Sequence, residues 1–266
     1  MLKIGIVGCG AIGSELARAI ERRFKTSAKL AYLCDSNPQA IQQLKKKLKL
    51  SAQAVSISEL VRKSDFVIEA ASQKAALEIV PLAIRLKKRI MVMSVGGLLK
   101  MNRTLSQVGQ GLLYVPSGAV SGIDGLLASR YGKIKRVTLT TRKPLASLKD
   151  APFFKKSKWS KKEIKKPTVI FEGSAASAIE QFPQNINVAA TLSLAGIGAK
   201  RTRVRIVTSP TYTCNSHQIE LEGSFGRIRT LTENVPSKAN PKTSALAIYS
   251  AIACLEKIFS PFKIGT

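Results

Sequence analysis

The chain has 266 residues, of which 45% are hydrophobic, a composition that supports a globular core and excludes a mainly disordered or collagen-like protein. Its 43 Lys and Arg residues outnumber its 16 Asp and Glu residues and give a formal net charge of +27, an excess typical of proteins that bind nucleic acid or an anionic membrane surface. At about 150 residues per domain, the length indicates one or two domains.

Neither a membrane-spanning segment nor a signal peptide is predicted. No stretch reaches about 18 uncharged apolar residues. The first ten residues, MLKIGIVGCG, lack the pattern of a signal peptide and are rich in glycine. We therefore expect a cytoplasmic protein with no membrane partner.

Four cysteines and one histidine limit the available chemistry. Cys9, Cys34, Cys214 and Cys254 lie far apart and form no CxxC pair, so no metal site or thioredoxin-like site is predicted. A disulfide framework is improbable in a chain so long and so poor in cysteine, and we expect reduced thiols. Any chemistry that needs an imidazole must use His217.

The first half of the chain alternates strand-like and helix-like segments. The predicted elements, in chain order, are a strand (2–7), a helix (11–24), a strand (29–34), a helix (38–48), a strand (66–71), a helix (73–86) and two strands (90–94 and 112–115). Strands that alternate with helices are typical of a parallel sheet with right-handed crossovers. The pattern predicts an α/β fold with an N-terminal Rossmann domain.

The pattern changes after residue 117. Segments 137–142 and 204–208 are rich in β-branched residues, and so are parts of 217–231, where Gly223 and Gly226 mark a turn. These segments predict a second, α+β domain with a mainly antiparallel sheet.

Two further segments complete the predicted organisation. The lysine-rich stretch 151–166 indicates a solvated loop with some hydrophobic anchoring. A final helix over about 242–258 is expected to pack back against the first domain. The predicted domains are therefore 1–117 with 241–266, and 118–240.

A glycine fingerprint follows the first predicted strand. Gly8, Gly10 and Gly13 form a GxGxxG sequence, in which the first glycine permits a tight turn and the second lets the backbone approach a pyrophosphate. The third allows the helix to lie close to the sheet. The pyrophosphate would bind at the helix N-terminus, where Ala11 and Ile12 lie and the dipole favours an anion.

Asp35 ends the second strand, twenty-two residues after Gly13. A carboxylate at this position binds the ribose hydroxyls and disfavours a 2′-phosphate. The alternative to a dinucleotide-binding site is a purely structural glycine turn that is followed by an aspartate at the surface. The strand–turn–helix context favours a dinucleotide site, with NAD as the expected cofactor and NADP as the alternative.

Asparagine residues in the second half allow two interpretations. Asn187 precedes a helix predicted at 188–195, where it could act as an N-cap or bind a nicotinamide or a substrate. Asn240 and Pro241 form a typical start of a helix. Lys242 would then oppose the helix dipole in the first turn, a placement that a bound anion would explain.

His217 lies in a polar segment, Asn215 to Gln218, which is predicted to form a turn. A histidine in such a turn could simply face solvent. Its ordinary pKa of about 6.5 would also suit a general acid or base near neutral pH.

Nine short motifs carry a family resemblance. They are GCGAIG (8–13), EAAS (69–72), SVGGL (94–98), PSGA (116–119), FEGSA (171–175), FPQNINVAATLSLAG (182–196), CNSH (214–217), EGSFG (222–226) and NPKTSALA (240–247). On these motifs the sequence resembles the L-aspartate dehydrogenase family over nearly its whole length. The FPxNxNVAA and NPKTS segments are the most specific.

The resemblance implies a Rossmann domain with an α+β catalytic domain, commonly in a homodimer. It implies oxidative deamination of L-aspartate to iminoaspartate or oxaloacetate and ammonia, with NAD(P)⁺ as the hydride acceptor, and a role in NAD biosynthesis through iminoaspartate. It further implies that His217 is the catalytic residue and that Ala119 and Asn187 contact the cofactor.

A dicarboxylate substrate needs cations or hydrogen-bond donors at both ends. We expect Lys242, Thr243 and Ser244 to bind one carboxylate, with Asn185 and Asn215 as weaker candidates. His217 is expected to act as a general base on the water that attacks the imine.

Other classes of protein remain as alternatives. Dihydrodipicolinate reductase and homoserine dehydrogenase share the two-domain plan, but the former usually has a histidine-rich catalytic segment. A basic nucleic-acid-binding Rossmann protein would need exposed aromatics along a positive stripe, and aromatics make up only 6% of this chain. An inactive NAD sensor would not need the CNSH and NPKTS segments. Nucleic acid is therefore not an expected partner.

Overall fold

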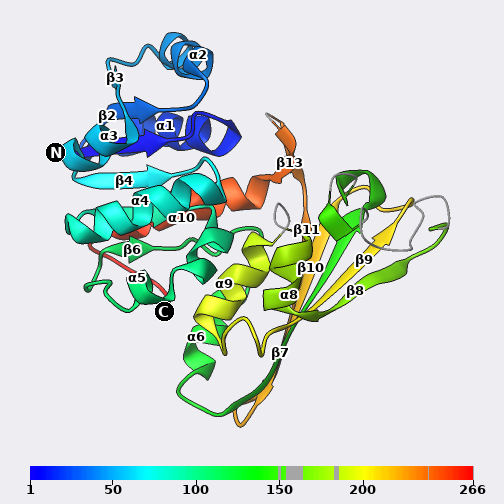
Figure 1. Ribbon diagram of the computed structural model, residues 1–266. Helices are drawn as coiled ribbons and strands as arrows, with labels where there is room; N and C mark the ends of the chain where they lie inside the picture. The colour runs from blue at the N-terminus through cyan, green and yellow to red at the C-terminus, as the bar shows by residue number, and fades with distance from the viewer. Residues whose placement is uncertain (149–150, 154–163, 183–185, 239, 266) are drawn as a thin grey trace. The chain divides into compact units, whose positions relative to one another are not determined.

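The chain divides into two units, each with its own sheet (Figure 1). Unit 1 comprises residues 1–116 and 248–263, and unit 2 comprises residues 117–247 and 264–266. No helix in the described part of the chain is long and apolar enough to cross a membrane. The computed structural model describes residues 1–148, 151–153, 164–182, 186–238 and 240–265.

Unit 1 contains a six-stranded parallel sheet with the strand order β3-β2-β1-β4-β5-β6. This order reverses direction between β1 and β4, which places a topological switch point at the carboxyl ends of these two strands. The predicted Rossmann domain is therefore confirmed, with the short β3 as an addition. The strands are β1 (Leu2–Val7), β2 (Ala28–Cys34), β3 (Gln53–Ala54), β4 (Phe66–Glu69), β5 (Arg89–Val92) and β6 (Leu113–Tyr114).

The helices of unit 1 begin at residues suited to helix starts. Asn37 accepts a hydrogen bond from the backbone N–H of Gln39, with Pro38 as the first helical residue, and Ser72 accepts one from Ala75. The predicted helices are confirmed, and α3 is an addition that the periodicity did not indicate. The helices are α1 (Ala11–Arg23), α2 (Pro38–Leu48), α3 (Ile57–Lys63), α4 (Gln73–Arg85) and α5 (Asn102–Leu105), with a 3₁₀ segment, η1 (Val95–Lys100).

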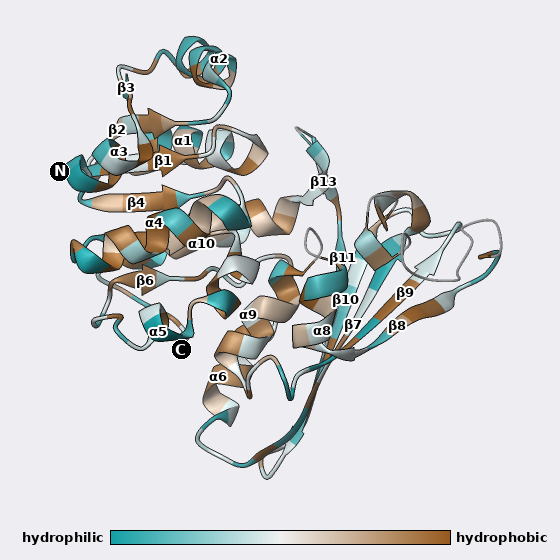
Figure 2. Cartoon of the chain, viewed as in Figure 1, coloured by the Kyte–Doolittle hydropathy of each residue, from teal (hydrophilic) through white to brown (hydrophobic). Residues whose placement is uncertain are grey.

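The C-terminal helix α10 (Ala245–Phe259) packs in the core of unit 1, as expected. Ala251 and Leu255 are fully buried in the same hydrophobic cluster as Leu16 and Ile20 of α1. The rings of Phe24 and Phe259 lie 5.4 Å apart. In Figure 2, β4 is coloured as hydrophobic and α2 as largely hydrophilic, in keeping with a buried sheet and a solvated helix.

The predicted start of this last helix is wrong. Residues Asn240–Ser244 form a short strand, β13, that pairs antiparallel with β12 (Pro236–Ser237). The N–H of Ala245 donates to the carbonyl of Val235 across this pair, so the helix begins only after the strand ends. Pro241 lacks an N–H donor and is tolerated at the edge of such a pair.

Unit 2 contains a five-stranded sheet with the order β11-β10-β7-β9-β8. Only β7 and β9 are parallel, so the prediction of a mainly antiparallel sheet is confirmed. Its strands are β7 (Ile134–Pro144), β8 (Thr168–Ser174), β9 (Arg203–Ser209), β10 (Asn215–Gly223) and β11 (Gly226–Asn234), and its helical segments are α6 (Ile123–Ser129), η2 (Leu145–Leu148), α8 (Ala175–Gln181) and α9 (Asn187–Ala195).

The two faces of this sheet differ in polarity. Val137, Leu139 and Ile219 are buried on one face. The other face carries exposed ion pairs, such as Arg136 with Glu222 at 2.5 Å. Ion pairs of this kind add little stability because water screens them.

The polar segment around His217 is not a turn. Asn215 to Gln218 form the first part of β10, between β7 and β11. The polar composition misled the prediction because the interior of unit 2 uses polar residues at this end of the sheet. Residues 154–163, which include most of the lysine-rich stretch, lie outside the described residues, but the ring of Phe153 stacks on that of Phe182 at 5.1 Å.

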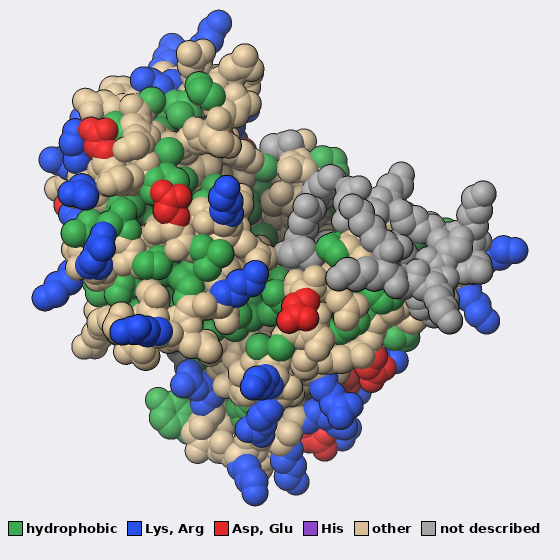
Figure 3. All heavy atoms as spheres, viewed as in Figure 1, with side chains coloured by type: hydrophobic (Ala, Val, Ile, Leu, Met, Phe, Trp, Pro, Cys, Tyr) green, Lys and Arg blue, Asp and Glu red, His purple; other side chains and the backbone are tan. Residues whose placement is uncertain are grey.

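Positive charge is distributed over many elements, and Figure 3 shows Lys and Arg side chains scattered over the face in view. Part of the excess lies in the last turns of helices, as in α1 (Arg22, Arg23) and α2 (Lys45, Lys46, Lys47). Cations at these positions interact favourably with the negative end of the helix dipole.

From the packing of α10 we predict how substitutions in this helix change the free energy of unfolding. Leu255→Ala should lower the free energy of unfolding by about 2–5 kcal/mol, because it leaves a cavity in the core of unit 1. Tyr249→Ala is the matched control in the same helix, since this ring is 63% exposed, and should change stability by less than about 0.5 kcal/mol. Urea unfolding of both variants checks this. Equal effects would show that α10 does not pack as described.

Candidate functional site

The glycine fingerprint forms a tight turn between β1 and α1. Gly8 has a φ of +100°, and a Cβ there would lie 2.5 Å from the carbonyl oxygen of Ala70. A Cβ on Gly13 would lie 1.8 Å from the carbonyl oxygen of Gly8. Both positions therefore require glycine for the fold itself.

Gly10 differs from its two neighbours in the fingerprint. A Cβ at this position would meet no atom of the protein within 4 Å, so the fold leaves open space there. Gly10 is also the N-cap of α1, and no side chain caps this helix end. The helix, which begins with Ala11 and Ile12, can offer its first N–H groups to an anion in this space.

Asp35 follows β2 directly and lies beside the glycine turn. Its carboxylate accepts hydrogen bonds from the backbone N–H groups of Cys9, at 2.7 Å, and Asn37, at 2.8 Å. These bonds hold one carboxylate oxygen against the fingerprint and the other against the start of α2. The open space at Gly10, the uncapped helix end and this carboxylate together fit the pyrophosphate and ribose of a dinucleotide.

Glu69 is a buried carboxylate at the carboxyl end of β4. It accepts hydrogen bonds from the N–H groups of Ala71, Ser72 and Ser94 and from the hydroxyl of Ser94, all within 3.0 Å. Burial raises the pKa of Glu69, and these hydrogen bonds act in the opposite direction. The carboxylate joins the loops that follow β4 and β5. The motif EAAS was noted in the sequence, but this role of its glutamate was not.

His217 lies in β10 and is 4% exposed. Its Nδ1 is 3.1 Å from the hydroxyl oxygen of Thr141, its partner in the β10–β7 register. Its Nε2 has no hydrogen-bond partner among the described residues. Burial, and then the charge of Lys143, lower the pKa of His217 to about 3, so the ring is neutral near pH 7 instead of titrating there.

Lys143 is the second unusual side chain on the sheet face that carries His217. Sequence reasoning did not single it out as a site residue among the 43 Lys and Arg residues. It is 6% exposed, and burial lowers its pKa to about 8. It lies two residues after Thr141 in β7, so strand alternation places both on the face that carries His217. Lys143 directly follows the β-branched segment 137–142, so extending the alternation of that segment by one residue was the available signal.

Asn234 connects three of the segments that the sequence singled out. This residue, 3% exposed at the end of β11, donates from Nδ2 to the carbonyl of Ala119 at 3.0 Å. Its Oδ1 accepts a hydrogen bond from the hydroxyl of Ser244, and its backbone pairs with Asn215. Ala119, Asn215 and Ser244 therefore lie near one another. Sequence reasoning missed Asn234 because no motif contains it.

The remaining expected site residues lie in different settings. Asn187 is the first residue of α9, with Ile186 at the N-cap position, so the N-cap interpretation is wrong. Lys242 and Thr243 lie in β13, and the argument from a helix dipole at Lys242 no longer holds. Asn185 and the side chain of Lys242 lie outside what the structure describes.

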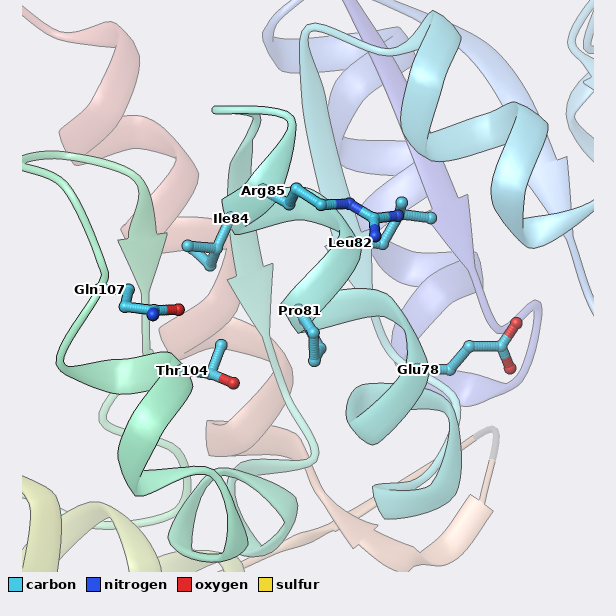
Figure 4. Close-up of a pocket in the computed structure, with 7 residues that line it drawn as sticks. All are labelled: Glu78, Pro81, Leu82, Ile84, Arg85, Thr104 and Gln107. Carbon is cyan, nitrogen blue, oxygen red and sulfur yellow. The ribbon is translucent and has the colours of Figure 1, made fainter.

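A pocket of about 480 Å³ opens in unit 1 away from these residues (Figure 4). Its lining comes from the later part of α4 and from the segment around α5 and includes Pro81, Leu82, Arg85 and Thr104. In Figure 4 the Glu78 side chain lies apart from Gln107. None of the candidate residues lines this pocket, and we assign it no role.

Two family models match the chain. One, described as "Aspartate dehydrogenase, C-terminal", matches residues 124–258. The other, described as "Homoserine dehydrogenase, NAD binding domain", matches residues 8–110. The first model covers more than half of the chain and includes β7, β10 and His217.

Curated relatives match the chain over its whole length. L-aspartate dehydrogenase of Methanosarcina barkeri is 47% identical over 272 residues, and that of Methanocella arvoryzae is 45% identical over 271 residues. L-aspartate dehydrogenase of Methanocaldococcus jannaschii is 40% identical over 273 residues. In each case the match covers 100% of both chains.

Solved structures share the architecture. Aspartate dehydrogenase from Thermotoga maritima matches with a TM-score of 0.78 and 25% identity over 100% of both chains. Scyllo-inositol dehydrogenase from Lactobacillus casei, solved with NAD(H) and scyllo-inositol, matches with a TM-score of 0.55 and 15% identity, over 97% of this chain and 89% of that one. The second similarity concerns the fold alone.

The glycine geometry predicts two opposite outcomes for the same substitution. Gly10→Ala should leave the unfolding temperature unchanged and weaken NADH binding by about tenfold or more, because its methyl group fills only the open space. Gly13→Ala should lower stability by about 1–3 kcal/mol or more, because its methyl group meets a backbone carbonyl. Thermal unfolding and NADH fluorescence titration measure both. A stable Gly13→Ala protein, or normal NADH binding by Gly10→Ala, would contradict this account.

Proposed function

The chain belongs to the L-aspartate dehydrogenase family and is an NAD(P)-dependent oxidoreductase, and from this premise we propose that its substrate is L-aspartate. The reaction oxidises the amino acid to iminoaspartate, which water converts to oxaloacetate and ammonia. The observation that carries the proposal is the full-length identity of up to 47% with proteins that have this activity by name.

The cofactor site proposed for unit 1 uses the glycine turn and Asp35. Gly8, Gly10 and Gly13, with the N–H groups of Ala11 and Ile12, hold the pyrophosphate. When bound, the nicotinamide ring accepts a hydride from Cα of the amino acid.

Three further residues are proposed to contact the cofactor. Asp35 accepts hydrogen bonds from the ribose hydroxyls, which favours NAD over NADP. Ala119 and Asn187 contact the nicotinamide end, as the family resemblance implies. The bond between the carbonyl of Ala119 and Asn234 supports this role, because it fixes the backbone of the PSGA segment.

His217 is proposed as the general base for hydration of the imine. Its Nε2 takes a proton from the attacking water while the water oxygen bonds to the imine carbon. For Nε2 to be free of hydrogen in the neutral ring, Nδ1–H must carry the proton, and the Thr141 hydroxyl oxygen can accept a hydrogen bond from it. The amine of the resulting carbinolamine then takes this proton from Nε2. As the C–N bond breaks and ammonia leaves, Nε2 accepts the proton of the hydroxyl group, which becomes the carbonyl of oxaloacetate.

The substrate-binding residues remain proposals. Thr243 and Ser244 in β13, together with Lys242, are proposed to bind a carboxylate, and Asn215 and Asn185 to contribute polar contacts. The hydrogen bond between Ser244 and the buried Asn234 supports this, because it joins β13 to the face that carries His217. We also propose a homodimer, on the family resemblance alone.

A panel of amino acids with NAD and with NADP tests the proposed substrate. Reduced cofactor, followed by its absorbance, should accumulate with L-aspartate and far less with L-glutamate, L-alanine or D-aspartate. A folded sample that fails to reduce either cofactor with L-aspartate would overturn the proposal.

The role of His217 predicts a large loss of turnover. His217→Gln should lower kcat by about 10²–10⁴-fold, the usual contribution of a general base. Binding of NADH should be unchanged, because His217 is not among the residues proposed to hold the cofactor. Thr141→Val keeps the imidazole and loses only its orienting partner, so it should lose less. Near-normal turnover in His217→Gln would remove the general-base role.

The position of Asp35 predicts a change in cofactor preference. Asp35→Ala should raise the KM for NAD by about tenfold and should raise that for NADP less, because the carboxylate binds the ribose hydroxyls and repels a 2′-phosphate. Asp65→Ala is the control, since Asp65 also accepts a backbone hydrogen bond, from Lys3, but at the amino end of β4. Steady-state kinetics with both cofactors decide the point. An equal effect on the two cofactors would rule out ribose recognition by Asp35.

A further inference from the structure

Lys143 is a buried cation without an anionic partner. Its side chain is 6% exposed, and no ion pair or hydrogen bond to its ammonium group occurs within the described residues. Because transfer of an unpaired charge out of water is costly, a lysine at such a position destabilises the protein unless an anion accompanies it. Lys135, on the same strand, is exposed and illustrates the ordinary placement.

Asn215 carries a buried hydrogen-bond acceptor that is not satisfied. Its Oδ1 is buried and lacks a hydrogen-bond donor. The β10–β7 ladder pairs His217 with Thr141 and ends with Ser216 opposite Arg142, and continuing this antiparallel register by one residue brings Asn215 opposite Lys143. Side chains opposite one another in an antiparallel pair have Cβ atoms about 5 Å apart. An acceptor without a donor and a cation without an anion therefore lie side by side.

We propose that Lys143 and Asn215 form the site for the amino-acid end of the substrate, with Lys143 binding the α-carboxylate and Asn215 Oδ1 accepting a hydrogen bond from the α-amino group. This rests on the proposed function. An α-amino acid carries both groups on one carbon, which matches two adjacent side chains with opposite needs. A dicarboxylate without an amine satisfies Lys143 alone.

The placement brings Cα of the substrate beside His217. Asn215 and His217 are two residues apart in β10 and share a face, as do Lys143 and Thr141 in β7. The flanking strands add no other charge to this face, because Thr141 and Thr232 pair with His217 whereas Arg142 and Glu233 pair with Ser216 on the other face. A carboxylate on Lys143 offsets the only charge that lowers the pKa of His217.

The single histidine makes the site visible by NMR. In protein saturated with NADH, which cannot accept a hydride, both L-aspartate and succinate should shift the His217 Cε1–H resonance. Lys143→Met should weaken the binding of both ligands about tenfold or more. Asn215→Leu should weaken the binding of L-aspartate by a similar factor and leave that of succinate within about twofold, since succinate has no amine.

Controls separate this binding role from a structural one. Lys135→Met should bind both ligands as wild type does, and Lys143→Arg, which keeps the charge, should retain succinate binding within a few-fold. Lys143→Met should unfold at the same or a higher temperature than wild type, because it removes a buried charge.

Three outcomes would overturn the proposal: no shift of His217 in wild type, unchanged binding of both ligands by Lys143→Met, or equal losses for L-aspartate and succinate in Asn215→Leu. If L-aspartate reduces neither NAD nor NADP and the Lys143-dependent shifts persist, the proposed function fails and the carboxylate site stands.

Discussion

The antiparallel pairing of β7 with β10 is the constraint on which the candidate site of unit 2 depends. A register in which His217 is opposite Thr141 holds the imidazole Nδ1 against the Thr141 hydroxyl, and its continuation by one residue brings Asn215 opposite Lys143. A slip of β10 by one residue would move His217 and Asn215 to the face that carries the exposed ion pairs and separate them from Thr141 and Lys143. The burial of Leu139 and Ile219 on the same face opposes such a slip. Hydrophobic packing at one end of the strands therefore fixes the positions of the polar side chains at the other end.

The two units place their polar groups according to different rules. In unit 1 the buried side chains of the parallel strands are hydrophobic except at Glu69, and the polar groups collect at the carboxyl edge of the sheet, where Gly10, Asp35 and Glu69 occur. In unit 2 they lie within the strands themselves, at His217 and Lys143. A parallel Rossmann sheet is covered on both faces and leaves only its edge for ligands, whereas a mixed sheet can use part of one face.

Sequence reasoning could identify what depends on local spacing. The GxGxxG turn, the helix that starts at Pro38 and the alternation of strands with helices are local patterns with local causes, and each occurs in the structure. Sequence reasoning could not predict that Lys143 is buried, because its burial depends on strands that are distant in the chain. It mistook Asn215–Gln218 for a turn and the segment at Pro241 for a helix start, since polar residues, Asn and Pro favour such structures unless tertiary pairing overrides them.

The carboxylate of Glu69 has a consequence for affinity. By accepting hydrogen bonds from the loops after β4 and β5, at Ser72 and Ser94, it ties them to a common point. Segments fixed in this way lose their conformational freedom when the chain folds and have little left to lose when a ligand arrives. Pre-organisation of this kind strengthens binding without adding a contact, because it lowers the entropic cost of association. A side chain that touches no ligand can thus set how tightly the carboxyl edge of the sheet holds one.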